Sequence, residues 1–295
     1  MDVINFMRSN RDYFEDFVTR STYHSNAIEG STLTRGETYA LLWNDNSMTV
    51  KTTPREFYEA VNHKAAFALA CGGLEEPLSE RLIKDINRAI NKDINDYAGY
   101  RTVGVVILGM DYVPPEANQV PQLMMQIVHR YQHDERDPFE READFHIHFE
   151  HVHPFGDGNG RTGRILINRG LLRDGIAPAV VSVDDKAQYI ELIDGWDTSG
   201  LAAMLRELSE AEAERIEIFR QPREQERVPR RHEEVRGDCE RTAEGARAGA
   251  GVGDPSVIPS SSVTFAQLAE ADAKQPRVKN EEARGGTARG NGRGR

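Results

Sequence analysis

Apolar residues recur at every third or fourth position over most of the first 220 residues, which is the spacing of amphipathic helices. The first helix is expected over about 10–30, with aromatic residues on its inner face and Gly30 at its end. Capping signals at Thr53 and Ser79 mark two later helix starts. The pattern predicts further helices over about 39–43, 54–71, 80–90, 120–131, 139–152, 161–172, 186–196 and 201–219.

One stretch departs from the helical period. Residues 102–108 are rich in β-branched side chains, 109–111 can form a turn, and Tyr112 and Val113 return toward two prolines. We therefore expect a small β-hairpin in an otherwise helical protein. The exposed edge of such a ribbon can pair with an extended segment of another protein.

The composition changes abruptly after Arg220. Residues 221–236 are mostly charged residues and proline, and the remainder is rich in Gly, Ala, Ser and Arg. Such a segment cannot bury enough apolar surface to fold alone, so we expect a disordered tail over 221–295. Its Arg/Gly-rich end is similar to segments that contact RNA or acidic surfaces, but a solvated tail is the simpler interpretation.

Charge and cysteine content narrow the class of protein. The formal net charge of −11 disfavours a general nucleic-acid binder, because neutralising phosphates supplies most of that affinity. Two cysteines, Cys71 and Cys239, are too few for a disulfide framework. The sequence shows no basic leader and no apolar run of bilayer length, so we expect a cytoplasmic protein without a membrane partner.

The chemistry concentrates in residues 153–164, which read His-Pro-Phe-Gly-Asp-Gly-Asn-Gly-Arg-Thr-Gly-Arg. The glycines and the apolar run after them indicate a tight turn that opens a helix near Arg161, where free amides and the helix dipole favour anions. Arg161 and Arg164 share one face of that first turn and can bind phosphate oxygens. Asp157 suits Mg²⁺ beside phosphates, and His153 can accept a proton near neutral pH. The stretch therefore predicts a polyphosphate site.

Other motifs match this region less well. A calcium loop starting at Asp157 would need Glu at its twelfth position, where Asn168 stands, and a Walker P-loop would need Lys after Gly160. The spacing Gly-x-Gly-x-x-Gly suggests a dinucleotide fold, but the preceding residues 145–150 alternate apolar and polar side chains, unlike a buried first strand. The neighbouring histidines lack the spacing of a zinc site.

The stretch resembles the signature of the Fic domain family, His-x-Phe-x-Asp/Glu-Gly-Asn-Gly-Arg-x-x-Arg, at every defining position. The resemblance implies an all-α fold, a Fic-type helical bundle with the β-hairpin as a flap over about 101–115. It also implies transfer of AMP from ATP to a Ser, Thr or Tyr hydroxyl of a target protein that docks at the flap. Residues 1–220 would form this Fic domain.

The same resemblance assigns roles to individual residues. His153 would be the general base, and Asp157 would hold Mg²⁺. Arg161 and Arg164 would hold the ATP phosphates, and Tyr189 lies where the family builds the nucleotide-base side of its pocket. The anion hole would be formed by Gly158, Asn159 and Gly160.

A second resemblance lies at the end of the first helix. Residues 25–30, Ser-Asn-Ala-Ile-Glu-Gly, match the inhibitory motif Ser/Thr-x-x-x-Glu-Gly/Asn of one class of Fic proteins. By that resemblance, Glu29 would pair with Arg164 and occupy the place of the ATP γ-phosphate. An ordinary helix end with a solvated Glu29 is the alternative interpretation.

The sequence leaves three functions open. The first is an autoinhibited protein adenylyltransferase that uses ATP and Mg²⁺. The second is removal of AMP from a modified protein, in which case Glu29 would position a water molecule. The third is a nucleotide-binding regulatory module whose chemistry is secondary. Both the target protein and the formation of a homo-oligomer stay open at this level.

Overall fold

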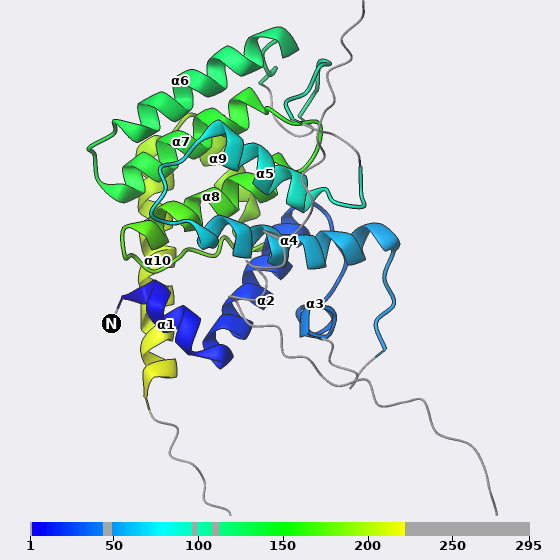
Figure 1. Cartoon of the computed structure of the whole chain (residues 1–295), viewed down its shortest axis with the longest axis vertical. Helices are drawn as coiled ribbons and strands as arrows, with labels where there is room; N and C mark the ends of the chain where they lie inside the picture. The colour runs from blue at the N-terminus through cyan, green and yellow to red at the C-terminus, as the bar shows by residue number, and fades with distance from the viewer. Residues whose placement is uncertain (1, 44–48, 96–98, 108–111, 222–295) are drawn as a thin grey trace, which may run out of the picture.

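The computed structural model describes residues 2–43, 49–95, 99–107 and 112–221. Within these ranges the chain forms α-helices, one short 3-10 helix and no β-strand, which confirms the all-α class (Figure 1). The elements in chain order are α1 (Val3–Ser9), α2 (Arg11–Ile28), α3 (Arg35–Trp43), α4 (Pro54–Gly72), α5 (Glu80–Ile90), η1 (Ala117–Gln119), α6 (Val120–Gln132), α7 (Pro138–Val152), α8 (Asn159–Arg173), α9 (Lys186–Asp194) and α10 (Thr198–Arg220).

Helix boundaries differ from the predicted ones where single residues interrupt the pattern. The predicted first helix matches α2, and a short helix that was not predicted, α1, precedes it; Asn10 between them is extended, and its side chain caps α2 by accepting from the amide of Tyr13. α8 begins at Asn159, earlier than the apolar run suggests. α9 ends at Asp194, since Trp196 has a left-handed backbone with φ of 56°.

The predicted flap has a different local structure. Its described limbs, 101–107 and 112–115, contain no strand, so the expected β-hairpin is not confirmed; its turn lies outside the described residues. The limbs are joined instead through the side chain of Arg101, which donates hydrogen bonds to the carbonyls of Val103 and Pro115. An arginine side chain thus links the two limbs where the prediction placed a ladder of main-chain hydrogen bonds.

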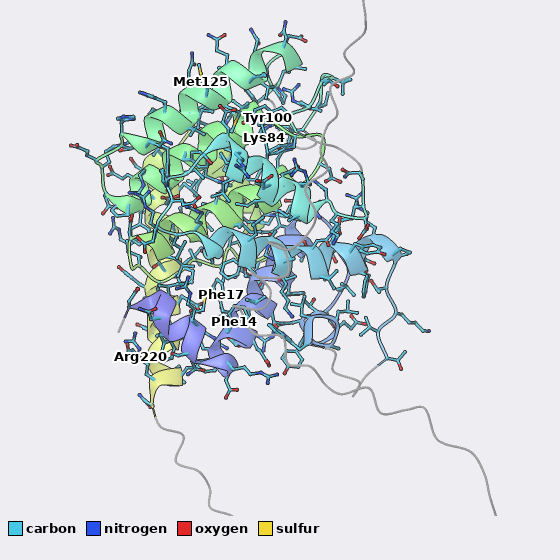
Figure 2. All side chains as sticks on the ribbon, viewed as in Figure 1. Phe14, Phe17, Lys84, Tyr100, Met125 and Arg220 are labelled. Atoms are coloured by element: carbon cyan, nitrogen blue, oxygen red, sulfur yellow. The ribbon has the colours of Figure 1, made fainter. Side chains whose placement is uncertain are left out.

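α7 and α8 form the centre of the molecule, and the other helices pack around them (Figure 1). α7 packs against α6, α8, α9 and α10, whereas α8 packs against α2, α4, α5 and α7. Three apolar clusters fill the spaces between these helices, and Phe14 and Phe17 of α2 enter the cluster shared with α1 and α4 (Figure 2). None of the helices in the described segments combines the length and apolarity that a bilayer span requires.

The turn between α7 and α8 brings two helix ends together. α7 starts with Asp137 as its cap and Pro138 at its first position, and it ends at Val152 with His153 as its C-cap residue. Gly158, with φ of 76°, is the N-cap residue of α8, a conformation that glycine adopts without steric cost. The carbonyl end of one buried helix therefore lies beside the amide end of the next.

Candidate active site

His153 is the C-cap residue of α7. Its backbone is left-handed (φ 47°, ψ 62°), and its amide donates to the carbonyl of Phe149 at 2.9 Å. Its side chain is 23% exposed, and Nδ1 lies 3.9 Å from Oε2 of Glu150. Burial lowers the pKa of His153 below its usual value, so the imidazole is neutral at pH 7 and can accept a proton.

The side chain of Asn159 holds the turn that follows. Its Oδ1 accepts from the amide of Phe155 and its Nδ2 donates to the Phe155 carbonyl, each at 2.9 Å. The Phe155 ring is buried against Tyr100 and Phe149. The Asn159 side chain therefore shapes the loop, while the amides of residues 158–160 stand at the N-terminal end of α8, where they favour an anion.

Asp157 belongs to a ring of alternating charges beside this turn. Its Oδ1 accepts from Arg161 Nη2 at 2.9 Å, and its Oδ2 accepts from Arg55 Nη2 at 2.7 Å. Both arginines also lie next to Oε1 of Glu59, at 2.9 Å for Arg55 and 3.2 Å for Arg161. The ring fixes the orientation of the Asp157 carboxylate and of the buried Arg161 guanidinium.

Arg164 links α8 to the end of α2. Its Nη2 donates to Glu29 Oε1 at 2.7 Å, and its Nε and Nη2 donate to the hydroxyl and carbonyl of Ser25, each at 2.9 Å. The Glu29 side chain is 39% exposed. Its partial burial favours a higher pKa, but the charge and hydrogen bond of Arg164 outweigh this effect and hold the pKa of Glu29 below its ordinary value. Glu29 is therefore ionised at neutral pH.

The same carboxylate lies over the first turn of α8. A Cβ atom at Gly160 would overlap Glu29 Oε1 and would lie 2.9 Å from Arg164 Nη1, so a glycine is needed for this close approach. Amides at a helix N-terminus favour negatively charged oxygens. The Glu29 carboxylate thus occupies a position at which the sequence predicts an anion.

A buried polar group supports the back of the site. Tyr189, expected near the nucleotide base, is only 1% exposed, and its hydroxyl forms a hydrogen bond with Nε2 of His146. His146 Nε2 in turn lies 3.9 Å from Glu150 Oε1. Burial lowers the pKa of His146 to about 3 and raises the pKa of Glu150 to about 8, so both are mainly uncharged at pH 7. A role of Tyr189 in binding the base stays a prediction.

Sequence reasoning missed several residues that the fold brings to the site. Arg55 and Glu59 lie in α4, about a hundred positions before Asp157, and their only local signal is an acid–base pair four residues apart, which is common on helix surfaces. Glu150 stands one helical turn before His153, and this spacing was the one available hint.

Asp157 is the predicted metal-binding side chain of this site. Within the described residues, no three His, Cys, Asp or Glu side chains come together as a metal-binding group. Asp157 offers a partly exposed carboxylate beside the helix end that favours anions. Mg²⁺ commonly binds one or two carboxylates together with substrate phosphates, so the arrangement fits an ion that enters with a nucleotide.

Residues 77–171, which include most of this site, match the model of the Fic/DOC family. The chain is 36% identical over 177 residues to protein adenylyltransferase fic-1 of Caenorhabditis elegans, covering 57% of this chain and 34% of that protein. It is 38% identical over 120 residues to a probable protein adenylyltransferase of Aquifex aeolicus, covering 40% and 37% of the two chains. The chain thus spans little more than a third of the length of these curated relatives.

Solved structures share the helical arrangement. A Fic domain containing signaling protein from Bacteroides thetaiotaomicron matches 71% of this chain and 88% of its own, with a TM-score of 0.62 and 25% identity. Fic-1 from C. elegans matches 73% and 71% of the two chains, with a TM-score of 0.59 and 28% identity. This chain shares with these proteins a helical bundle, and its glycine-rich helix start lies beside a neutral histidine. Residues 77–171 of this chain match the Fic/DOC family, so this part of the chain is a Fic-type domain.

Proposed function

We propose that this protein is a protein adenylyltransferase, which transfers AMP from ATP to a Ser, Thr or Tyr hydroxyl of a target protein and is restrained by Glu29. The names of its relatives support the reaction class. The observation that carries the proposal is the neutral His153 at the end of α7, beside a helix N-terminus whose anion position holds a carboxylate.

His153 acts as the general base. Its imidazole takes the proton of the target hydroxyl, whose oxygen attacks the α-phosphorus of ATP in line. The bond between the α-phosphorus and the oxygen that bridges to the β-phosphorus breaks, and pyrophosphate leaves with that electron pair. Because Nδ1 is buried and turned toward Glu150, Nε2 is the nitrogen that meets the hydroxyl.

The N-terminal end of α8 binds the phosphates that carry the developing charge. The amides of residues 158–160 point toward this charge, and Arg161 is already fixed by Asp157 and Glu59 before the nucleotide binds. Asp157 would hold a Mg²⁺ that enters with ATP, and this ion supplies further neutralisation of the phosphates when bound. Such preorganised donors stabilise the transition state without a reorganisation cost.

Glu29 restrains the reaction because it pairs with Arg164, which would otherwise bind the nucleotide phosphates. While Arg164 donates to Glu29 and Ser25, those donors are engaged by α2 rather than by a nucleotide. A γ-phosphate placed at this end of α8 would also meet the ionised Glu29, and like charges at short range repel. Displacement of Glu29 should therefore permit productive binding of ATP.

Intact-protein mass spectrometry after incubation with ATP and Mg²⁺ tests the proposal. We expect an adduct of AMP mass on the protein itself that increases in Glu29→Gly. The adduct should disappear in Glu29→Gly/His153→Ala, although this double variant should still bind ATP. An adduct that persists without His153 would refute the general-base assignment, and equal modification of wild type and Glu29→Gly would refute the restraint.

Removal of AMP from a modified protein is the second candidate. It is favoured by the ionised, partly exposed Glu29 carboxylate, which could orient a water molecule near His153. Incubating an AMP-modified preparation of the Glu29→Gly protein with unmodified wild type separates the two functions. Loss of the adduct with wild type but not with Glu29→Gly supports hydrolysis, whereas persistence with both leaves transfer as the function.

A further inference from the structure

Arg101 stands apart from the other buried arginines near the site because its hydrogen-bond partners in the described chain are main-chain carbonyls. It is 6% exposed. Its Nε donates to the carbonyl of His153 at 2.8 Å, and its Nη2 donates to that of Val152 at 3.3 Å. Nη1 donates to Val103 at 3.0 Å, and Nη2 also donates to Pro115. One guanidinium therefore joins two parts of the chain that lie about fifty residues apart.

Two of these carbonyls, those of Val152 and His153, belong to the last residue of α7 and to its C-cap. Helix C-termini leave carbonyls without partners inside the helix, and a cation there also interacts favourably with the helix dipole. His153 needs such support, because a left-handed backbone is unfavourable for a residue with a Cβ atom. The amide of Arg101 adds a further bond to the Pro154 carbonyl at 2.8 Å. Arg101 thus fixes the backbone on both sides of the His153–Pro154 peptide.

The other two carbonyls mark the ends of the segment 101–115. Val103 lies on its incoming limb and Pro115 at its outgoing end, so the guanidinium sets the distance between the limbs. The residue before Arg101 is also anchored: the Tyr100 hydroxyl donates to Glu80 of α5, and Lys84 Nζ lies 4.1 Å from the Tyr100 ring centre (Figure 2). The base of the segment is therefore held on α5 and on the end of α7 at once.

We infer that Arg101 is a positioning residue, which holds His153 in its left-handed conformation and sets the place of the described limbs, 101–107 and 112–115, relative to the imidazole. The inference rests on the proposed transfer reaction, in which that segment would present the target hydroxyl. A base and a hydroxyl react only when they meet at hydrogen-bonding distance, and a misplacement of about 1 Å can cost about 100-fold in rate. Arg101 acts through His153 and does not touch the reacting atoms.

Arg169 provides a matched comparison within the same molecule. It is also buried, at 1% exposed, and its Nη2 likewise donates to two carbonyls, those of Gly73 and Glu76. These carbonyls follow α4 and belong to neither α7 nor the segment 101–115. Loss of either arginine should lower stability, but only loss of Arg101 should change the chemistry.

The test compares Arg101→Gln, Arg101→Lys and Arg169→Gln, each in the Glu29→Gly protein, with self-modification by ATP and Mg²⁺ as the activity. We expect Arg101→Gln to lower kcat by about 10- to 100-fold while the KM for ATP stays within about threefold. Arg101→Lys should recover part of kcat, because an ammonium keeps the charge and three donors. Arg169→Gln should melt earlier with kcat unchanged. A folded Arg101→Gln protein with unchanged kcat would overturn the inference.

Two readouts separate a positioning role from a loss of stability. Hydrogen exchange should quicken at residues 101–107 and 153–155 in Arg101→Gln but not in Arg169→Gln, and equal protection in both would overturn the inference. The positive charge of Arg101 also lowers the pKa of His153, while Glu29 and Asp157 raise it. Arg101→Gln should therefore move the acid limb of the kcat–pH profile to higher pH, and Arg101→Lys should not.

The parent protein distinguishes failure of this inference from failure of the proposed function. If Glu29→Gly itself forms no AMP adduct, the proposed self-modification fails, and the exchange measurement alone decides whether Arg101 positions His153. If the parent is active and both the exchange and kcat of Arg101→Gln match those of Arg169→Gln, Arg101 is a structural residue only.

Discussion

Glu150 is a carboxyl that the fold buries between two histidines, His146 and His153, with one oxygen that makes no hydrogen bond within the described chain. Burial raises the pKa of Glu150 to about 8, while the nearby charges of Arg164 and Glu29 act in opposite directions. A carboxyl in an unfolded chain titrates at about 4.3. Between these values the folded protein keeps a proton that the unfolded chain has lost.

The expected consequence is a stability that falls as the pH rises. The contribution of Glu150 is fully present below about pH 4 and declines by up to about 1.4 kcal/mol per pH unit until the pH passes 8. Glu150→Gln keeps the shape and removes the titration. Between pH 5 and pH 8, the free energy of unfolding of Glu150→Gln, measured in urea, should therefore increase relative to that of wild type.

Glu140→Gln, an exposed change on the same helix, is the control and should show no such divergence. Burial also raises the pKa of Glu142 to about 7, so Glu142 contributes its own pH dependence of stability. This contribution is the same in all three proteins and cancels when their free energies of unfolding are subtracted. Parallel curves for wild type and Glu150→Gln would contradict a protonated Glu150.

Among individual residues, the sequence predicts those site residues that lie together in one short motif. His153, Asp157 and Arg164 are spaced by local geometry, so a single stretch predicts that they come together. Arg101 and Glu59 could not be predicted, because their partners are set by helix packing across about fifty and one hundred residues. A main-chain carbonyl as a partner leaves no mark in the sequence at all.

Among the elements, the start of α4 shows how a local signal also fastens a distant segment. Thr53 and Glu56 form the predicted capping box around Pro54. The other oxygen of Glu56 accepts from the amide and hydroxyl of Thr32, each at 2.8 Å, just beyond the end of α2. The cap therefore connects the chain that follows Glu29 to the helix that carries Arg55.

Thr53→Ala should lower the free energy of unfolding by about 1 kcal/mol, the usual cost of losing an N-cap side chain. Thr52→Ala is the matched control, since in the described part of the chain its hydroxyl donates to the neighbouring Thr53 carbonyl and caps no helix. Chemical denaturation of the two variants beside wild type measures both values. Equal stability of the two variants would show that the box does not stabilise α4.

Helices with caps and regular apolar spacing were predictable as elements, and the flap was not. The β-branched run from Val103 favours a strand, but that preference depends on a paired neighbour. The described limbs are linked by Arg101 to each other and to the end of α7. The strand preference of these residues is overridden by tertiary hydrogen bonds to Arg101, which a sequence pattern cannot show.

For the molecule as a whole, the Glu29–Arg164 pair is one of several polar contacts that join α2 to the helices of another apolar cluster; the Lys186 ammonium, which donates to the Ile28 carbonyl at 2.6 Å, is a second. α2 contributes to the cluster with α1 and α4, and α8 lines the cluster with α7, α9 and α10. The Glu29–Arg164 pair crosses between them at the anion position of α8. If Glu29 restrains ATP binding as proposed, the pair stabilises the protein without nucleotide and weakens its affinity for nucleotide.

Glu29→Gly should lower the melting temperature without ATP, because the buried Arg164 loses its charged partner at a cost of about 1–3 kcal/mol. With saturating ATP and Mg²⁺ its melting temperature should rise further than that of wild type, since a tenfold tighter Kd adds about 1.4 kcal/mol of stabilisation. Differential scanning fluorimetry over a series of ATP concentrations measures both effects. His153→Ala should show the same ATP-induced rise as wild type, because His153 contacts the hydroxyl rather than the phosphates. An equal rise in Glu29→Gly and wild type would mean that Glu29 does not compete with the nucleotide, however tightly it holds Arg164.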